Sequence, residues 1–267
     1  MSNLDAGQIR QALDSKTSDC LDELEIFGSI ASTNTYLISQ PAPAPERFRV
    51  AIADHQTSGR GRHYRRWVSP PGAGLYMSLA YSFEAKPEQL PSLTLATGVG
   101  VINALQELGI DGVTLKWPND IVALDGKLGG VLTEIQSRPT AGVTVVTGIG
   151  LNIDFPDDAE ASIESDWAAR TVDLADISDP LPDRSKVAAT LLDHVHGVMR
   201  KFAAFGFARF AEHWAGYDWL RQREVIVDQT DKQIVGIAAG VDKDGALLVD
   251  TDDGQVRIVS GSVMVAG

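Results

Sequence analysis

The segment at residues 55–67 gathers four arginines into seven positions, Arg60, Arg62, Arg65 and Arg66, in a chain of net charge −13. Guanidinium groups bind phosphate in a fixed bidentate geometry. The two glycines beside the first arginines let the backbone approach the same anion. The segment indicates a loop that binds an anionic ligand. A solvated basic loop or an RNA-binding patch would have the same composition.

A second polar group follows the strand predicted at residues 113–116, where Lys116, Trp117 and Pro118 lead into Asn119 and Asp120. Proline ends the strand, so these side chains are presented at its end. Amide and carboxylate oxygens suit a magnesium-bound phosphate, and Lys116 adds a positive charge. A structural turn capped by the Asn-Asp pair is the alternative.

Lys127 follows an Asp-Gly turn and precedes Gly129 and Gly130 at the start of a predicted strand. Two glycines weaken a strand, which is useful where a ligand must lie flat against the backbone. The alternative is an exposed lysine beside a bulge.

Two shorter groups are less specific. Ser32, Thr33 and Asn34 precede a predicted helix and could bind a ligand or simply cap that helix. The run from Gly148 to Asn152 ends an apolar strand with an amide side chain.

Hydrophobic periodicity places these groups on an α+β fold, a mixed sheet flanked by helices with a small all-β barrel after it. Asp-Gly turns separate the short strands of the barrel. The predicted strands are 49–53, 74–83, 113–116, 130–135, 143–149 and several between 224 and 265, with the three from 113 to 149 central in the sheet. The predicted helices are 5–24, 91–108 and 187–205, and alternating prolines at 41–45 indicate a stiff loop. We expect a leader at 1–25, a catalytic domain at 26–219 and the barrel at 220–267.

Composition limits the possible roles. The acidic balance opposes binding to nucleic acid or to an anionic membrane. Cys20 is the single cysteine and cannot form an internal disulfide, and no signal peptide or membrane-spanning run is evident, so we expect a cytoplasmic protein. Dinucleotide, phosphate-loop, zinc-protease and serine-hydrolase motifs are missing from the sequence.

In order and spacing, the five groups together resemble the biotin protein ligase family. The resemblance covers roughly residues 26 to 265. It implies a catalytic domain similar to class II aminoacyl-tRNA synthetases and an SH3-like barrel. It also implies an ATP-dependent reaction, through biotinyl-adenylate, that joins biotin to a lysine of a biotin carboxyl carrier protein.

The resemblance implies residue roles by position. Biotin would contact Ser32, Thr33, Asn34, Gln56, Gly59, Arg60, Gly61, Arg62, Lys127, Gly129 and Gly130. ATP would contact Arg62, Arg65, Trp67, Lys116, Asn119, Asp120, Asn152 and Trp167. Magnesium would be held by Asn119, Asp120 and Asn152, and the catalytic groups would be Lys127, Arg62 and Arg65. The loop at 60–67 is expected to be mobile until its anion binds.

Two departures from the family pattern stand out. Tyr64 replaces the glycine usual before Arg65, so the loop can close differently. The leader is too short for the DNA-binding domain of repressor members, so we expect an enzyme that does not bind DNA, with a homodimer possible. Other readings stay open: a lipoate or other acyl ligase on the same scaffold, a small-molecule sensor or RNA-binding module, or an inactive relative.

Overall fold

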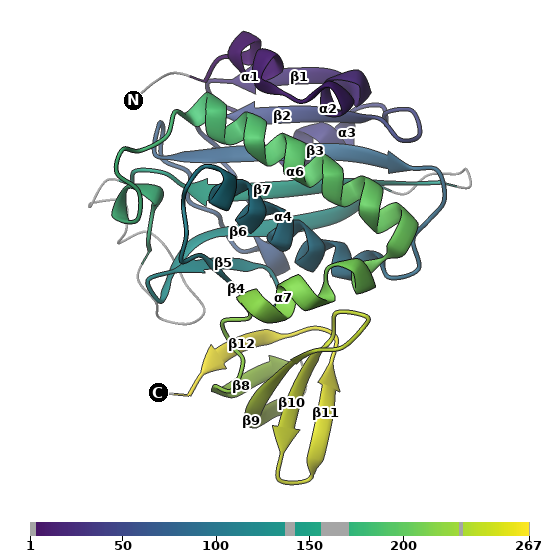
Figure 1. Ribbon diagram of the computed structural model, residues 1–267, viewed down its shortest axis with the longest axis vertical. Coiled ribbons are helices and arrows are strands. Elements are labelled where there is room, and N and C mark those ends of the chain that lie inside the picture. The colour runs from purple at the N-terminus through teal and green to yellow at the C-terminus, as the bar shows by residue number, and fades with distance from the viewer. Residues whose placement is uncertain (1–3, 137–141, 156–170, 230–231, 267) are drawn as a thin grey trace.

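A computed structural model describes residues 4–136, 142–155, 171–229 and 232–266. The chain forms a seven-stranded sheet covered by helices, followed by a separate five-stranded sheet (Figure 1). The predicted α+β class and the small C-terminal β domain are confirmed.

The large sheet has the strand order β1-β2-β3-β7-β6-β5-β4. Strands β1 and β2 pair in parallel and all other neighbours are antiparallel, so the sheet is mixed as predicted. Its strands are β1 (Leu21–Phe27), β2 (Phe48–Ala53), β3 (Gly74–Phe83), β4 (Thr114–Lys116), β5 (Asp120–Ala123), β6 (Gly126–Gln136) and β7 (Val143–Asn152). Every residue of central strand β3 is buried, which explains its continuous apolar sequence.

Two long helices, α4 (Leu93–Glu107) and α6 (Arg184–Phe205), lie across one face of this sheet (Figure 1). Their apolar side chains join the main core. The short helix α3 (Thr33–Ser39) packs on the opposite face, where Leu37 contacts small residues of the strands. None of the helices in the described part of the chain is long and apolar enough to cross a membrane.

The helix predicted over 5–24 is wrong at its C-terminal end. The chain forms α1 (Ala6–Ala12) and α2 (Ser15–Cys20), and Leu21 then begins β1. Leu21 and Leu24 are three apart, a spacing that fits a helix in sequence but belongs here to a strand with an irregular register. Strand β1 thus crosses residue 25, where the leader was expected to end.

The position of the strand predicted at 113–116 is also wrong, because β4 is an edge strand rather than a central one. Helix α7 (Ala211–Tyr217) and the backbone of Asp218 lie against β4, so Leu115 and Lys116 are as buried as residues of a central strand.

The second sheet is antiparallel and consists of β8 (Glu224–Gln229), β9 (Lys232–Val241), β10 (Leu247–Thr251), β11 (Gly254–Ile258) and β12 (Ser262–Val265). Gly245, at φ 83°, forms the predicted turn between β9 and β10. Trp117 Nε1 donates a hydrogen bond to the Gly245 carbonyl at 3.1 Å, which fixes the small domain beside the end of β4.

Candidate active site

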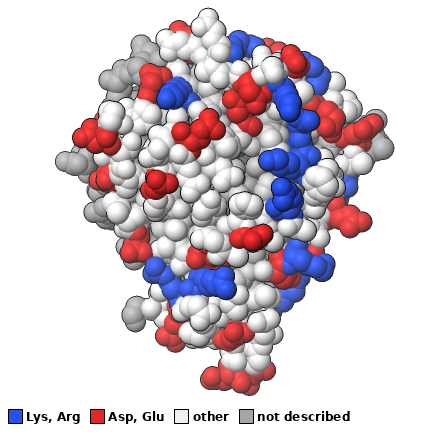
Figure 2. All heavy atoms as spheres, in the orientation of Figure 1, with Lys and Arg blue, Asp and Glu red and all other residues white. Residues whose placement is uncertain are grey.

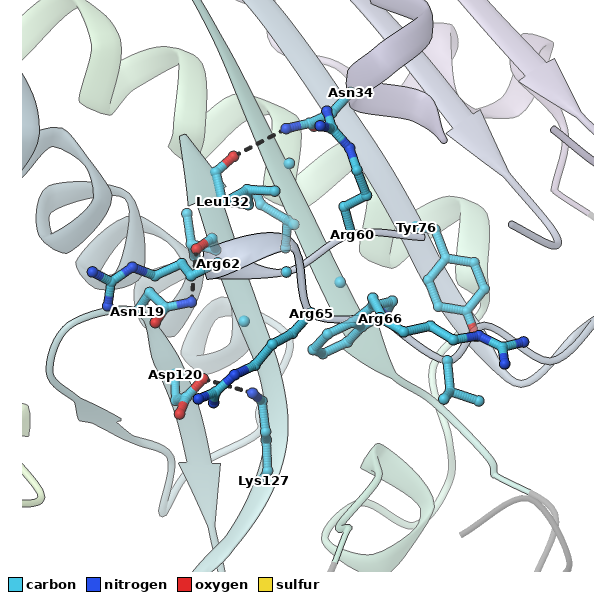
Figure 3. Close-up of a pocket in the computed structure, with 18 of the residues that line it drawn as sticks. Asn34, Arg60, Arg62, Arg65, Arg66, Tyr76, Asn119, Asp120, Lys127 and Leu132 are labelled. Atoms are coloured by element: carbon cyan, nitrogen blue, oxygen red, sulfur yellow. Dashed lines mark hydrogen bonds and ion pairs between the residues drawn. The ribbon is translucent and has the colours of Figure 1, made fainter. Parts of the chain in front are cut away.

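One pocket on the α3 side of the large sheet brings together side chains from all five sequence groups (Figure 3). The loop at residues 60–67, called the arginine loop, covers the pocket. Residues 261–263 of the small domain form part of its wall. The predicted residues that line it are Ser32, Thr33, Asn34, Gln56, Arg60, Gly61, Arg62, Arg65, Trp67, Lys116, Asn119, Asp120, Lys127, Gly130 and Asn152.

Hydroxyl and amide groups gather at one end of the pocket. The buried Ser78 Oγ lies 2.6 Å from both Thr33 Oγ1 and Asn34 Oδ1. Gln56 Oε1 accepts hydrogen bonds from the Thr33 backbone N–H at 2.9 Å and from its hydroxyl at 3.2 Å. Ser32 caps α3, so the capping interpretation also holds for that residue. This end can donate and accept hydrogen bonds to a neutral polar ligand group.

Positive groups gather at the other end, around one carboxylate. Lys127 Nζ lies 2.8 Å from Asp120 Oδ1, and Lys116 Nζ lies 3.9 Å from Asp120 Oδ2. Arg65 points towards the same carboxylate (Figure 3), and Arg62 is close enough to interact with it electrostatically. Four cations around one anion leave an excess of positive charge that favours an anionic ligand.

Burial lowers the pKa of two of these cations. It lowers the pKa of the Lys116 ammonium to about 8, against an opposing contribution from Asp120. It also lowers the pKa of the Arg62 guanidinium, which Asp120 again partly offsets. Both charges are desolvated in the pocket, so an anion there would interact with them more strongly than in water.

The indole of Trp67 lies over the strand glycines between the two ends. A methyl group on Gly150 would lie 2.6 Å from the Trp67 ring, and one on Gly130 would lie 3.6 Å from it. Lys127 Nζ is 5.4 Å from the ring centroid. Trp67 Nε1 is buried and has no hydrogen-bond partner among the described residues, so a bound acceptor could satisfy it.

Residues 26–153 match the Biotin/lipoate A/B protein ligase family, and residues 223–265 match the Biotin protein ligase C terminal domain. The bifunctional ligase/repressor BirA of Salmonella typhimurium is 33% identical over 249 residues, which are 93% of this chain and 74% of that protein. The chain belongs to the biotin protein ligase family.

Other members of the family are similar to this chain along most of their length. The biotin--[acetyl-CoA-carboxylase] ligase of Mycobacterium tuberculosis is 30% identical over 91% of this chain and 88% of its own. The biotin protein ligase of Aquifex aeolicus, solved in complex with biotin and ATP, superposes with a TM-score of 0.77 at 27% identity, covering 92% of this chain and 100% of that one.

Some residues that were predicted to form the site of this biotin protein ligase are not found among the described residues that line the pocket. Gly59 and Gly129 do not line the pocket; a side chain at either would collide with a backbone carbonyl, of Trp67 and Gly150 respectively. Trp167 lies outside the described residues, as does the side chain of Tyr64.

The amides of Asn119 and Asn152 bind the protein backbone. Asn119 Nδ2 donates to the Val131 carbonyl at 3.1 Å. Asn152 Nδ2 donates to the carbonyls of Lys127 at 3.1 Å and Val172 at 3.0 Å. These bonds leave the amide oxygens as the groups that could face a ligand.

The sequence interpretation missed three parts of this biotin protein ligase site. Ser78 is a hydroxyl inside an apolar strand, a signal that was available. Glu134 pairs with Arg60, 74 positions away, and no local pattern indicates this. The small-domain segment 261–263 reaches the pocket only because of how the two sheets pack.

Proposed function

We propose that this protein activates biotin with ATP to biotinyl-5′-adenylate and transfers the biotinyl group to a lysine of a biotin carboxyl carrier protein. The observation that carries the proposal is the division of one pocket into a neutral polar end and a cationic end. Biotin has the matching division, with a ureido ring at one end and a carboxylate at the other. The proposal is also supported by the names of the related proteins.

Biotin's carboxylate and the triphosphate repel each other, so activation first needs cations that hold both. Lys127, Arg62 and Arg65 converge where the two anions would meet. A carboxylate oxygen attacks the α-phosphorus and pyrophosphate leaves; the same cations stabilise the extra negative charge of the transition state. The acceptor amine then attacks the carbonyl carbon, AMP leaves, and the nitrogen releases a proton to give the amide.

The residues fit a magnesium ion that arrives with ATP. Asp120 is the one carboxylate among the described residues that line the pocket, and two lysines already contact it. Magnesium commonly takes one carboxylate together with phosphate oxygens and water. Asp120 and the amide oxygens of Asn119 and Asn152 would hold it, and the ion would supply charge to the phosphates.

A lipoate ligase is the nearest alternative, because the matched family model includes both activities. The hydroxyls and amides of Thr33, Asn34, Gln56 and Ser78 favour a ureido ring over a dithiolane, because the apolar dithiolane has no group that can hydrogen-bond with them. The deciding experiment incubates the pure protein with MgATP, a carrier domain, and biotin or lipoate in parallel. The expected result is the biotin mass increment on the carrier; modification by lipoate alone would reject the proposal.

Enlarging Gly148 should weaken biotin binding. The added methyl of Gly148→Ala would lie 2.4 Å from Asn34 Oδ1, so the polar end must rearrange. Overpacking of this kind costs about 1–3 kcal/mol. We expect the KM for biotin to rise about tenfold, with the KM for ATP nearly unchanged. The control is Gly197→Ala in α6, where a methyl meets open space; equal effects in both variants would contradict the assignment.

The buried Lys116 should make the use of MgATP depend on pH. Its ammonium, with a pKa of about 8, is charged below that pH and neutral above it. We expect kcat/KM for MgATP, which reports the free enzyme, to fall as pH rises through about 8. Lys116→Arg should move the decline to higher pH, because guanidinium stays charged. A decline at the same pH in that variant would assign it to another group.

We also expect that the enzyme does not bind DNA, that it lies in the cytoplasm and that it can form a homodimer. Acidic and basic side chains are intermixed on the face that carries α4 and α6 (Figure 2). Together with the net charge of −13 this disfavours DNA binding, which a gel-shift assay would test. Location in the cytoplasm and formation of a homodimer stay predictions.

A further inference from the structure

The carboxylate of Glu134 connects three distant segments at the polar end of the pocket. Arg60 Nη2 donates to both carboxylate oxygens, at 3.0 and 2.9 Å. Asn34 Nδ2 donates to one of them at 2.8 Å. The three residues come from β6, the arginine loop and α3, and Figure 3 shows Arg60 reaching Asn34.

Glu134 fixes which end of the Asn34 amide faces the pocket. An ionised carboxylate only accepts hydrogen bonds, and so does the Leu132 carbonyl, 3.3 Å from Asn34 Nδ2. Both amide hydrogens of Asn34 are therefore used, and Oδ1 turns towards Ser78. Asn34 thus offers an acceptor, which is what a ureido N–H needs.

The same carboxylate holds the arginine loop against β6. The backbones of Arg60 and Arg66 pair across the loop, and the Trp67 N–H donates to the Gly59 carbonyl at 2.9 Å. The side chain of Arg60 is 30% exposed and that of Glu134 is 26% exposed, so their ion pair is partly shielded from solvent. Releasing Arg60 would therefore release the loop as a unit.

We propose that Glu134 is a positioning residue that sets the affinity for biotin, by presenting Asn34 as an acceptor and by holding the arginine loop closed. This inference rests on the proposed function. Glu134 itself does not line the pocket, so it acts through Asn34 and Arg60.

The first test is Glu134→Gln, which keeps the size of the side chain and removes its charge. Charge-assisted hydrogen bonds are about twice as strong as neutral ones. We expect the KM for biotin in pyrophosphate exchange to rise about tenfold while kcat changes less than about threefold. Trypsin should cut the ligand-free loop after its arginines about tenfold faster. The matched control is Glu25→Gln, a half-buried carboxylate that accepts from Tyr36 at 2.7 Å outside the pocket.

The exchange of charges, Arg60→Glu with Glu134→Arg, separates the two effects. The ion pair can form again, so the loop should recover most of its resistance to trypsin. An arginine at 134 only donates, so Asn34 must turn its oxygen away from the pocket and the KM for biotin should stay high.

Trypsin resistance is measured without any substrate, so it tests Glu134 even if the proposed function fails. A wild-type protein without biotin-dependent pyrophosphate exchange would reject that function. A Glu134→Gln loop cut at the wild-type rate, or a biotin KM equal to that of Glu25→Gln, would overturn the role of Glu134.

Discussion

Lys127→Ala is expected to lower biotin-dependent pyrophosphate exchange by about 10²–10³-fold, the usual loss when one preorganised donor to a developing charge is removed. The Lys127 ammonium lies 2.8 Å from Asp120, whose carboxylate holds it at the cationic end of the pocket. When substrates bind, the reacting phosphate and carboxylate oxygens would replace part of that interaction. Because negative charge develops on those oxygens in the transition state, loss of the ammonium should destabilise the transition state more than the bound substrates.

The measurement for Lys127 is the rate of exchange of labelled pyrophosphate into ATP with biotin saturating. The fold should survive, because the side chain lies at the pocket and is partly exposed; a thermal melt checks this. The control is Lys243→Ala, which removes an exposed lysine of the small domain. Exchange within about threefold of wild type in Lys127→Ala would remove this residue from the chemistry.

Arg62→Ala is expected to lower kcat/KM for adenylate formation by about a hundredfold, again the scale of a lost donor in a desolvated site. Burial lowers the pKa of its guanidinium, and its Nη1 donates to the Gly261 carbonyl of the small domain at 3.4 Å. The residue thus supplies charge to the pocket and contacts the segment that completes the pocket wall. Its loss should raise the KM for ATP as well as lower kcat.

The arginine loop offers a comparison for Arg62. Arg66 is exposed and points away from Asp120 and Lys127, beside Tyr76 (Figure 3). We expect Arg66→Ala to cost less than about tenfold in the same steady-state assay, since an exposed charge is screened by solvent. Equal losses in the two variants would mean that the loop acts through its total charge and not through the position of Arg62.

Residue type, spacing and the family resemblance indicated about half of the residues that line the pocket. Glycine pairs, strand ends and clustered arginines are local features, and local features are visible in sequence. For this reason Arg60, Lys127 and Asp120 could be recognised, as could the strands β2 and β3 and the helices α4 and α6.

Tertiary packing decided the remainder. Leu21 and Leu24 fit a helix by spacing, but pairing with β2 makes that segment a strand. Leu115 and Lys116 of β4 are buried because α7 packs against a sheet edge, which no local pattern reveals. Glu134 acquires its role from partners 74 and 100 positions away. Such contacts depend on how distant segments meet, because a charged residue on an alternating strand looks the same in sequence whether it faces solvent or an arginine.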